Sequence, residues 1–237
     1  MTSDQSEFWD RRYLDEGFIW GQEPSPTARM LTAYLPPGAQ VLDVGFGYGR
    51  DLPFLIRRGY RTSGIDLSVA GLRLAEQLLA RQGVQAEQLY VGRFEETHLP
   101  NAPFDGILSH RMAHLLVTRP AVERFVAKLV DVLRPGGMLF VAARNPRDLD
   151  PAAMVPIEEG VYEYRQRPGH RIRYWDEAFF HAVFDQSFDI LTLTDAVENE
   201  SVAQPVPCHF TVMIAQRKAG PTQRIAGLEG VPRQPGL

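Results

Sequence analysis

Short apolar runs alternate with amphipathic stretches of helical periodicity between residues 40 and 144, and this alternation constrains the fold more than any other feature of the chain. Five of the runs have the length and composition of buried strands: 40–45, 60–66, 87–92, 104–109 and 138–144. Strands that alternate with helices form βαβ units, in which the strands are parallel and the helices cover the sheet. We therefore predict an α/β fold around a parallel sheet, with glycines as helix C-caps at Gly59, Gly83 and Gly136.

The segments on either side of this core are less regular. Helices are predicted around residues 7–15 and from Ser25 onward, where Ser25 can cap the helix and Pro26 suits its first turn. Residues 145–173 are rich in proline, arginine and acidic residues and have weak periodicity, so we predict a long loop that serves as a binding element or lid. Three regular elements are expected after this loop: a helix at 176–184 and strands at 188–197 and 208–216.

The composition excludes several classes of protein. Lys and Arg total 25 against 29 Asp and Glu, and the net charge of −4 argues against broad binding of nucleic acid. The single cysteine, Cys208, permits no intramolecular disulfide and no cysteine-rich zinc site, and the histidine spacing suggests no metal site. The N-terminus lacks the pattern of a signal peptide, and no run of about 18 apolar residues occurs. We expect a cytoplasmic protein that binds neither nucleic acid, nor a membrane, nor a metal.

The first predicted strand turns into a helix through three alternating glycines, Gly45, Gly47 and Gly49. Glycines allow a tight turn and a close approach of the backbone to a ligand, and a helix N-terminus presents free N–H groups. This pattern predicts a site for a nucleotide-like ligand. A tight connection that binds no ligand is the alternative interpretation.

The spacing of these glycines indicates which ligand fits. The dinucleotide fingerprint G-x-G-x-x-G would need a third glycine where Arg50 stands, and no Gly-Lys-Ser/Thr follows to make a P-loop. Asp43 precedes the first glycine by two residues, where a carboxylate would repel a pyrophosphate but attract an ammonium or sulfonium group. We therefore favour a cationic amino-acid nucleoside over NAD or ATP.

The second predicted strand ends at Asp66, whose carboxylate can accept both hydroxyls of a ribose. The alternative role of Asp66 is to cap the next helix. Ser68 is itself a good cap, which favours ribose binding.

Four segments resemble the class I S-adenosylmethionine-dependent methyltransferases in order and spacing: VLDVGFGYGRD, GIDLS, FDGILSHRMAHLL and VLRPGGMLFVAAR, over roughly residues 40–144. The N-terminal FWDRRY and FIWGQEPSP are similar to the tellurite-resistance and thiopurine methyltransferase branch. The resemblance implies a Rossmann-like three-layer αβα sandwich with a seven-stranded, mostly parallel sheet and an antiparallel last strand. It also implies S-adenosylmethionine as the cofactor.

By this resemblance the glycines wrap the methionine part of the cofactor, Asp43 lies near its amino group and Asp66 binds its ribose. Members of the family usually carry an acidic residue for adenine where this chain has Arg93, so Glu95 or the ring and backbone N–H of Phe94 would take that role. The expected cofactor contacts in the core are Asp43, Gly45, Phe46, Gly47, Gly49, Arg50, Asp66, Leu67, Phe94, Glu95, Ser109 and His110.

Aromatic and basic side chains outside these motifs are further candidates. Trp20 is predicted to contact the cofactor, with simple packing as the alternative, whereas Phe8 and Tyr13 are expected to pack the first helix onto the sheet. His110 and His114 follow the fourth strand and are the candidate general bases, with a packing role as the alternative for His114. The basic run Arg165, Arg167, His170, Arg171 and Arg173 is a solvated surface or a cap that recognises a carboxylate or phosphate.

The sequence thus predicts an enzyme that transfers a methyl group to a small molecule. A thiol or another soft nucleophile is slightly favoured, with O- or N-methylation of a metabolite close behind. The alternative is a non-catalytic, regulatory domain that binds S-adenosylmethionine. Residues 1–217 are expected to form one domain, with a helical lid at 1–38 and a substrate-side insert at 145–175, followed by a flexible tail at 218–237.

Overall fold

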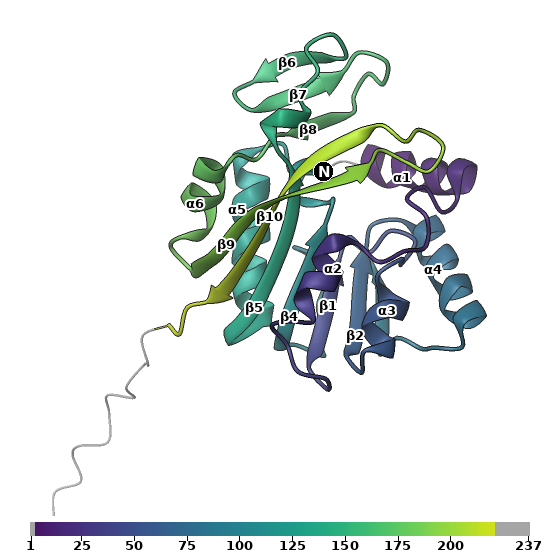
Figure 1. Ribbon diagram of the computed structural model, residues 1–237, viewed down its shortest axis with the longest axis vertical. Helices are drawn as coiled ribbons and strands as arrows, with labels where there is room; N and C mark the ends of the chain where they lie inside the picture. The colour runs from purple at the N-terminus through teal and green to yellow at the C-terminus, as the bar shows by residue number, and fades with distance from the viewer. Residues whose placement is uncertain (1–2, 221–237) are drawn as a thin grey trace, which may run out of the picture.

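The computed structural model describes residues 3–220, which form a sheet of seven strands between two layers of helices (Figure 1). The strands lie in the order β3-β2-β1-β4-β5-β10-β9. Their bounds are β1 Gln40–Val44, β2 Arg61–Asp66, β3 Gln88–Val91, β4 Phe104–His110, β5 Leu133–Arg144, β9 Phe188–Asn199 and β10 Pro207–Arg217. The first five strands pair in parallel, and β10 pairs antiparallel with both β5 and β9. The predicted seven-stranded, mostly parallel sheet with an antiparallel last strand is therefore confirmed.

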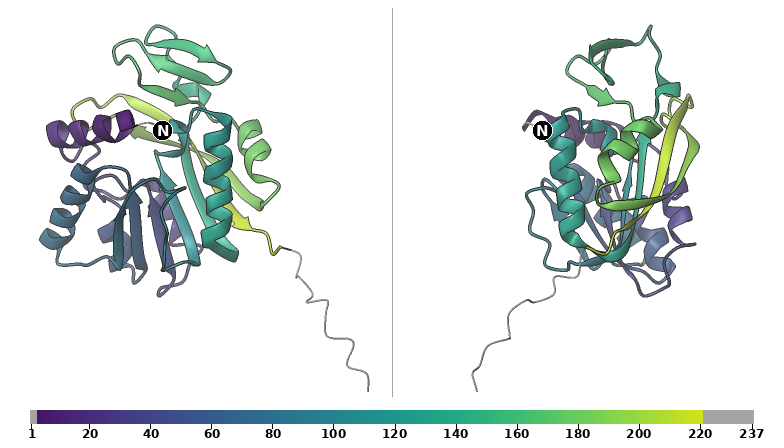
Figure 2. Two further views of the ribbon diagram at one scale, coloured as in Figure 1. Left: turned by 180° about the vertical axis from the view of Figure 1, so that it is seen from behind. Right: turned by 90° about the vertical axis from the view of Figure 1, so that its left-hand side faces the viewer.

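Helices cover both faces of the sheet because each carries one apolar stripe. On one face lie α5 (Arg119–Val132) and α6 (Glu177–Phe184), where Phe125 and Phe180 are fully buried in the main core (Figure 2). The other face is covered by α2 (Pro26–Leu31), α3 (Leu52–Arg57) and α4 (Val69–Gln82). Gly83 caps α4 with a φ of +64°, as predicted. Gly136 caps no helix, because α5 ends at Val132 and the chain enters β5 directly.

The first helix, α1 (Ser3–Glu16), lies beside the N-terminus of α4 (Figure 1). A carboxylate oxygen of Asp10 accepts hydrogen bonds from Ser68 Oγ at 2.5 Å and from the backbone N of Ala70 at 2.9 Å. These bonds hold α1 above the carboxyl ends of the parallel strands, where ligands of open α/β sheets bind.

The segment 145–173 contains a second small sheet, so the prediction of one long loop was wrong. The strands β6 (Met154–Glu158), β7 (Val161–Tyr164) and β8 (Arg171–Arg173) form an antiparallel sheet next to the carboxyl ends of the main strands (Figure 1). Short 3-10 turns at η1 (Ala113–Leu115) and η2 (Pro146–Asp148) precede it. Strands of three to five residues are too short to produce a readable period.

The hairpin of β9 and β10 extends beyond the main sheet and reaches the segment after α1 (Figures 1 and 2). The backbone N of Val202, between the two strands, donates to the carbonyl of Ile19 at 2.8 Å. The indole Nε1 of Trp20 donates to the carbonyl of Glu200 at 2.7 Å. The hairpin thereby closes one side of the space above the strand ends.

Two expectations concern segments at the margins of the fold. Of the predicted tail, residues 221–237 lie outside the described residues. Within residues 3–220, no helix is both long and apolar enough to cross a membrane.

Candidate active site

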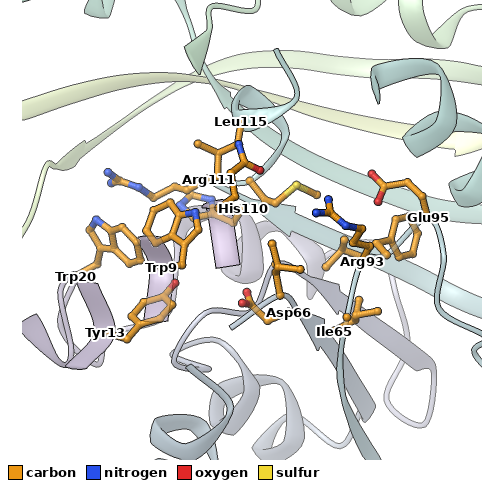
Figure 3. Close-up of a pocket in the computed structure, with 17 residues that line it drawn as sticks. Trp9, Tyr13, Trp20, Ile65, Asp66, Arg93, Glu95, His110, Arg111 and Leu115 are labelled. Atoms are coloured by element: carbon orange, nitrogen blue, oxygen red, sulfur yellow. The ribbon is translucent and has the colours of Figure 1, made fainter. Parts of the chain in front are cut away.

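A cavity opens at the carboxyl ends of β1, β2 and β4, beneath α1 (Figure 3). It holds about 740 Å³ of empty space when its open mouth is counted. Its lining comprises Gln5, Trp9, Tyr13, Trp20, Val44, Gly45, Ile65, Asp66, Leu67, Gly92, Arg93, Phe94, Glu95, His110, Arg111, Met112 and Leu115. A smaller cavity adjoins it and is lined by Asp43, Phe46, Gly47 and Arg50, among others. The structure thus brings most of the predicted cofactor contacts together.

A side chain at Gly45 or Gly47, in the glycine turn, would collide with neighbouring residues. Gly45 and Gly47 have φ values of +80° and +59°, which side chains disfavour. A Cβ atom on Gly45 would lie 2.7 Å from the side chain of Met112, and one on Gly47 would lie 2.5 Å from Tyr13 Oη. The bare backbone at both positions is what a closely bound ligand requires.

Gly49 serves a different purpose from the other two glycines. A Cβ atom there would lie 2.8 Å from the Cβ of Ala75, in α4. Gly49 lines neither cavity, so its position is explained by the close contact between the turn and α4.

Asp66 is held in place by two backbone N–H groups. One carboxylate oxygen accepts from the N of Gly47 and the other from the N of Ser68, both at 2.8 Å. The side chain of Ser68 caps α4 by accepting from the N of Gly71, as the sequence suggested. Each Asp66 oxygen retains a lone pair that can accept from a hydroxyl group, while burial raises the pKa of the carboxyl group.

Asp43 is 3% exposed and lines the smaller cavity. Its burial, with the charges of Asp51 and Asp66 nearby, raises the pKa of its carboxyl group well above the usual value. A buried carboxylate in this position is stabilised by a cation. The smaller cavity therefore suits the ammonium group of an amino acid.

The far side of the main cavity carries Arg93, Phe94 and Glu95, opposite Trp20 (Figure 3). Phe94 is 5% exposed and contacts Phe125 edge-on, with 5.7 Å between the ring centres. The Nε of Arg93 lies 3.9 Å from a carboxylate oxygen of Glu96. Arg93 and Glu95 both face the cavity, so the side chain that departs from the family pattern lies within it.

Aromatic rings from α1 and the following segment line the near side. Trp9, Tyr13 and Trp20 face the cavity, and Trp20 stacks on Tyr48 with 5.9 Å between the ring centres (Figure 3). Tyr13 also packs in the core, with 5% of its surface exposed. Tyr13 therefore both packs in the core and lines the cavity.

The two predicted bases have different surroundings. His110 lines both cavities, but its Nδ1 lies 2.9 Å from Thr27 Oγ1 and its Nε2 lies 2.6 Å from Glu198 Oε2. Burial lowers the pKa of His110, so Nε2 donates to the carboxylate and Nδ1 accepts from the hydroxyl. Neither nitrogen is free to take a proton from an acceptor.

His114 and Ser109 line neither cavity. His114 is 6% exposed and its Nδ1 has no hydrogen-bond partner among the described residues. Burial, together with the charges of Arg144 and Arg111, lowers the pKa of His114 well below the usual value. The hydroxyl of Ser109 is likewise buried without a partner in the described part of the chain.

Sequence analysis missed Arg111 and the two hairpin glutamates, Glu198 and Glu200. Arg111 adopts a φ of +64°, and its guanidinium lies between the rings of Trp20 and Phe210, 4.9 and 4.8 Å from their centres. Glu198 accepts from Arg50 at 2.9 Å as well as from His110. These partners lie at least 88 residues apart in the sequence, so no local pattern indicates them.

Comparison with known proteins agrees with this geometry. Residues 41–137 match the family model described as "Methyltransferase domain". The phthiotriol/phenolphthiotriol dimycocerosates methyltransferase of Mycobacterium leprae (strain TN) is 32% identical over 111 residues, which are 46% of this chain and 39% of that relative. The chain thus matches about two fifths of the length of this curated relative.

Solved structures share the fold over nearly the whole chain. One concerns the conversion of a disulfide bond into a thioacetal group during echinomycin biosynthesis; it has a TM-score of 0.72 and 19% identity, and covers 92% of this chain and 94% of its own. The TehB-like methyltransferase from Corynebacterium glutamicum ATCC 13032 has a TM-score of 0.60 and 20% identity, and covers 92% and 100%. The comparisons thus show a match to a methyltransferase domain over residues 41–137 and the α/β fold of these solved structures over nearly the whole chain.

Proposed function

We propose that this protein transfers the methyl group of S-adenosylmethionine to a small-molecule acceptor. The observation that carries the proposal is the cavity in which Asp66, fixed by the N–H of Gly47, faces the bare glycine turn. We place the methionine end of the cofactor beside Gly45, Gly47 and Asp43, and its ribose on Asp66. Leu67, Phe94 and Glu95 then border the adenine, and Trp20 faces the sulfonium.

The cofactor supplies an activated methyl group, which bonds to a lone pair of the acceptor while the electrons of the broken carbon–sulfur bond stay on sulfur. The protein has to orient the acceptor and exclude water from the site. We assign His110 a positioning role, since both of its nitrogens have partners, and Arg50 a role in holding Glu198 beside it.

Soft nucleophiles are favoured as acceptors. A thiol has a pKa near 8.5, so part of it is ionised at neutral pH without a strong base, whereas an alcohol needs one. The N-terminal similarity to the tellurite-resistance and thiopurine branch, the TehB-like fold and the neighbour that concerns disulfide and thioacetal chemistry support the same choice. O- or N-methylation of a metabolite is the second choice.

A regulatory domain that binds S-adenosylmethionine without turnover is the competing proposal. Arg93 favours it, because this cation stands in the cavity where the family usually has an acidic residue.

Thermal unfolding with S-adenosylhomocysteine, and with NADH as the control, tests the cofactor site. At a hundredfold excess over Kd, binding adds about 2.7 kcal/mol, which raises the Tm by about 5–10 °C for a domain of this size. A shift with NADH alone would contradict the proposal. Transfer of a labelled methyl group to a panel of thiols, phenols and amines then separates the enzyme from the regulatory domain, which transfers none.

A further inference from the structure

Three arginine side chains surround the carboxylate of Glu200, at the end of the hairpin. The Nη2 of Arg144 bonds to Oε2 directly, the Nη2 of Arg111 lies 3.5 Å from the same oxygen, and the Nη1 of Arg167 lies 4.0 Å from Oε1. The three arginines come from different elements: the end of β5, the residue after β4 and the loop between β7 and β8. Folding therefore brings three cations to one point.

Positive charge predominates at this point once the carboxylate of Glu200 is set aside. Asp148 pairs with Arg144 at 2.7 Å, and Glu198 lies 3.8 Å from Arg111. Without Glu200, two carboxylates therefore face three guanidinium groups. The pKa of the nearby His170 is lowered to about 4, first by burial and then by the charges of Arg167, Arg12 and Arg144. The contribution of these charges is what a positive potential predicts. Such a cluster of arginines recognises carboxylates and phosphates in proteins.

The cluster lies between two cavities. Arg111 lines the cavity assigned to the cofactor. Arg144, Arg167 and Glu200 line a second cavity, which holds about 1290 Å³ of empty space with its open mouth included. The rings of Tyr164 and Tyr174 and the side chains of Leu149 and Met154 give this second cavity apolar and aromatic walls. An anionic group held by the three arginines therefore lies at the border of both cavities.

The side chain of Glu200 can leave while its backbone stays. The carbonyl of Glu200 accepts from Trp20 Nε1 at 2.7 Å and from Arg111 Nη2 at 3.4 Å, and these bonds do not involve the carboxylate. The carboxylate itself is held by arginines and by the thiol of Cys208 at 3.0 Å. Rotation about the side-chain bonds of Glu200 would withdraw its carboxylate from the three guanidinium groups and leave these backbone bonds in place.

We propose that Arg111, Arg144 and Arg167 form the binding site for an anionic group of the methyl acceptor, and that the carboxylate of Glu200 occupies this site until the acceptor arrives. This rests on the proposed function. The acceptor is then a small molecule that carries a carboxylate or phosphate in addition to its nucleophile.

Binding of simple anions to the cofactor-free protein tests the site. Benzoate and phenyl phosphate represent the two anionic groups, and benzamide is the neutral isostere; their Kd values are measured by calorimetry. Glu200→Gln removes the internal competitor, and we expect it to bind benzoate or phenyl phosphate about tenfold more tightly than the wild type. Whichever probe responds more strongly identifies the anionic group.

Arg167→Gln removes one cation from a partly exposed position, and we expect about tenfold weaker binding. Arg171→Gln is the matched control, because Arg171 lies in the same small sheet but pairs with Glu163 at 2.7 Å. Anion affinity unchanged in Glu200→Gln, benzamide bound as tightly as benzoate, or equal losses in the two arginine variants would overturn the proposal. If Glu200→Gln fails to fold, the comparison of the two arginine variants decides.

The S-adenosylhomocysteine shift is measured separately on the same proteins. If the wild type binds the anions but not S-adenosylhomocysteine, the anion site is supported and the proposed methyltransferase function is contradicted. If the wild type binds S-adenosylhomocysteine but not the anions, the proposed function is supported and the anion site is contradicted.

Discussion

The Nε2 of His110, at the end of β4, lies 2.6 Å from a carboxylate oxygen of Glu198, 88 residues away in β9. Thr27 binds the other ring nitrogen from α2, so one imidazole connects three elements around the site. Burial by itself raises the pKa of the Glu198 carboxyl group, but the hydrogen bond from His110 and the charges of Arg50 and Arg111 outweigh burial and lower this pKa to about 2. Their bond fixes the hairpin against the sheet beside the smaller cavity.

A double-mutant cycle of His110→Gln and Glu198→Gln is expected to show a coupling energy of about 1–3 kcal/mol in urea unfolding, because the pair is buried and charge-assisted. The exposed pair Arg61–Glu87, 3.4 Å apart, provides the control cycle, with an expected coupling below about 1 kcal/mol. Additive effects at His110 and Glu198 would show that the two side chains do not stabilise each other.

Asp66→Ala is expected to weaken S-adenosylhomocysteine binding by about tenfold or more, because two hydroxyl groups of the ribose lose a charged acceptor. Asp105→Ala is the control: Asp105 also accepts from a backbone N–H, that of Gln40 at 2.8 Å, but it lies at the opposite end of the sheet. Titration calorimetry should give equal affinities for Asp105→Ala and the wild type. Equal losses in both variants would attribute the effect of Asp66 to stability alone.

Gly47→Ala is expected to lower both stability and affinity for S-adenosylhomocysteine. Alanine is strained at a φ of +59°, and its Cβ would also lie too close to Tyr13 Oη. Together these effects are expected to lower the free energy of unfolding by about 1–3 kcal/mol. Gly83→Ala has nearly the same backbone strain, at +64°, but open space around it. Thermal unfolding with and without S-adenosylhomocysteine should show a loss of stability in both variants and a loss of affinity in Gly47→Ala only.

The buried histidines are expected to destabilise the folded protein between pH 6.5 and about pH 5, while the raised pKa values of Asp43 and Asp66 act in the opposite direction. Burial lowers the pKa of His110, His114 and His170 in the folded state, so below pH 6.5 the unfolded chain binds more protons than the folded one. The free energy of unfolding then falls with pH, by up to about 1.4 kcal/mol per unit for each such histidine.

His114→Phe should reduce this slope, since one histidine of lowered pKa is removed. His181→Gln, on the solvent-exposed side of α6, is the matched control in urea unfolding at pH 7, 6 and 5. A slope that His114→Phe leaves unchanged would show that His114 titrates normally in the folded protein.

The parallel core and its ligand-binding turn could be predicted because their signals are local. Gly45 and Gly47 have φ values that favour glycine, and Asp66 is the last residue of β2, so both features can be recognised from a few neighbouring residues. The small sheet of β6, β7 and β8 was missed, because its strands are too short for a period and its pairing joins residues that only the fold brings into register.

The contacts of the charged residues around the site could not be predicted from the sequence either. His110 looked like a free base in the sequence, and only its contacts with Thr27 and Glu198 show that both nitrogens are used. Arg111 and Glu200 belong to segments 89 residues apart, and their pairing depends on how far the hairpin extends beyond the sheet.

The strands and helices of the parallel core, the glycine turn and the carboxylates beside it can be predicted from the amino-acid sequence, because hydrophobic periodicity and backbone conformation act over a few neighbouring residues. Which charges meet above the strand ends depends instead on the folded arrangement. Ion pairs depend on distances of a few ångströms between elements that are remote in the chain, and those distances are set by packing.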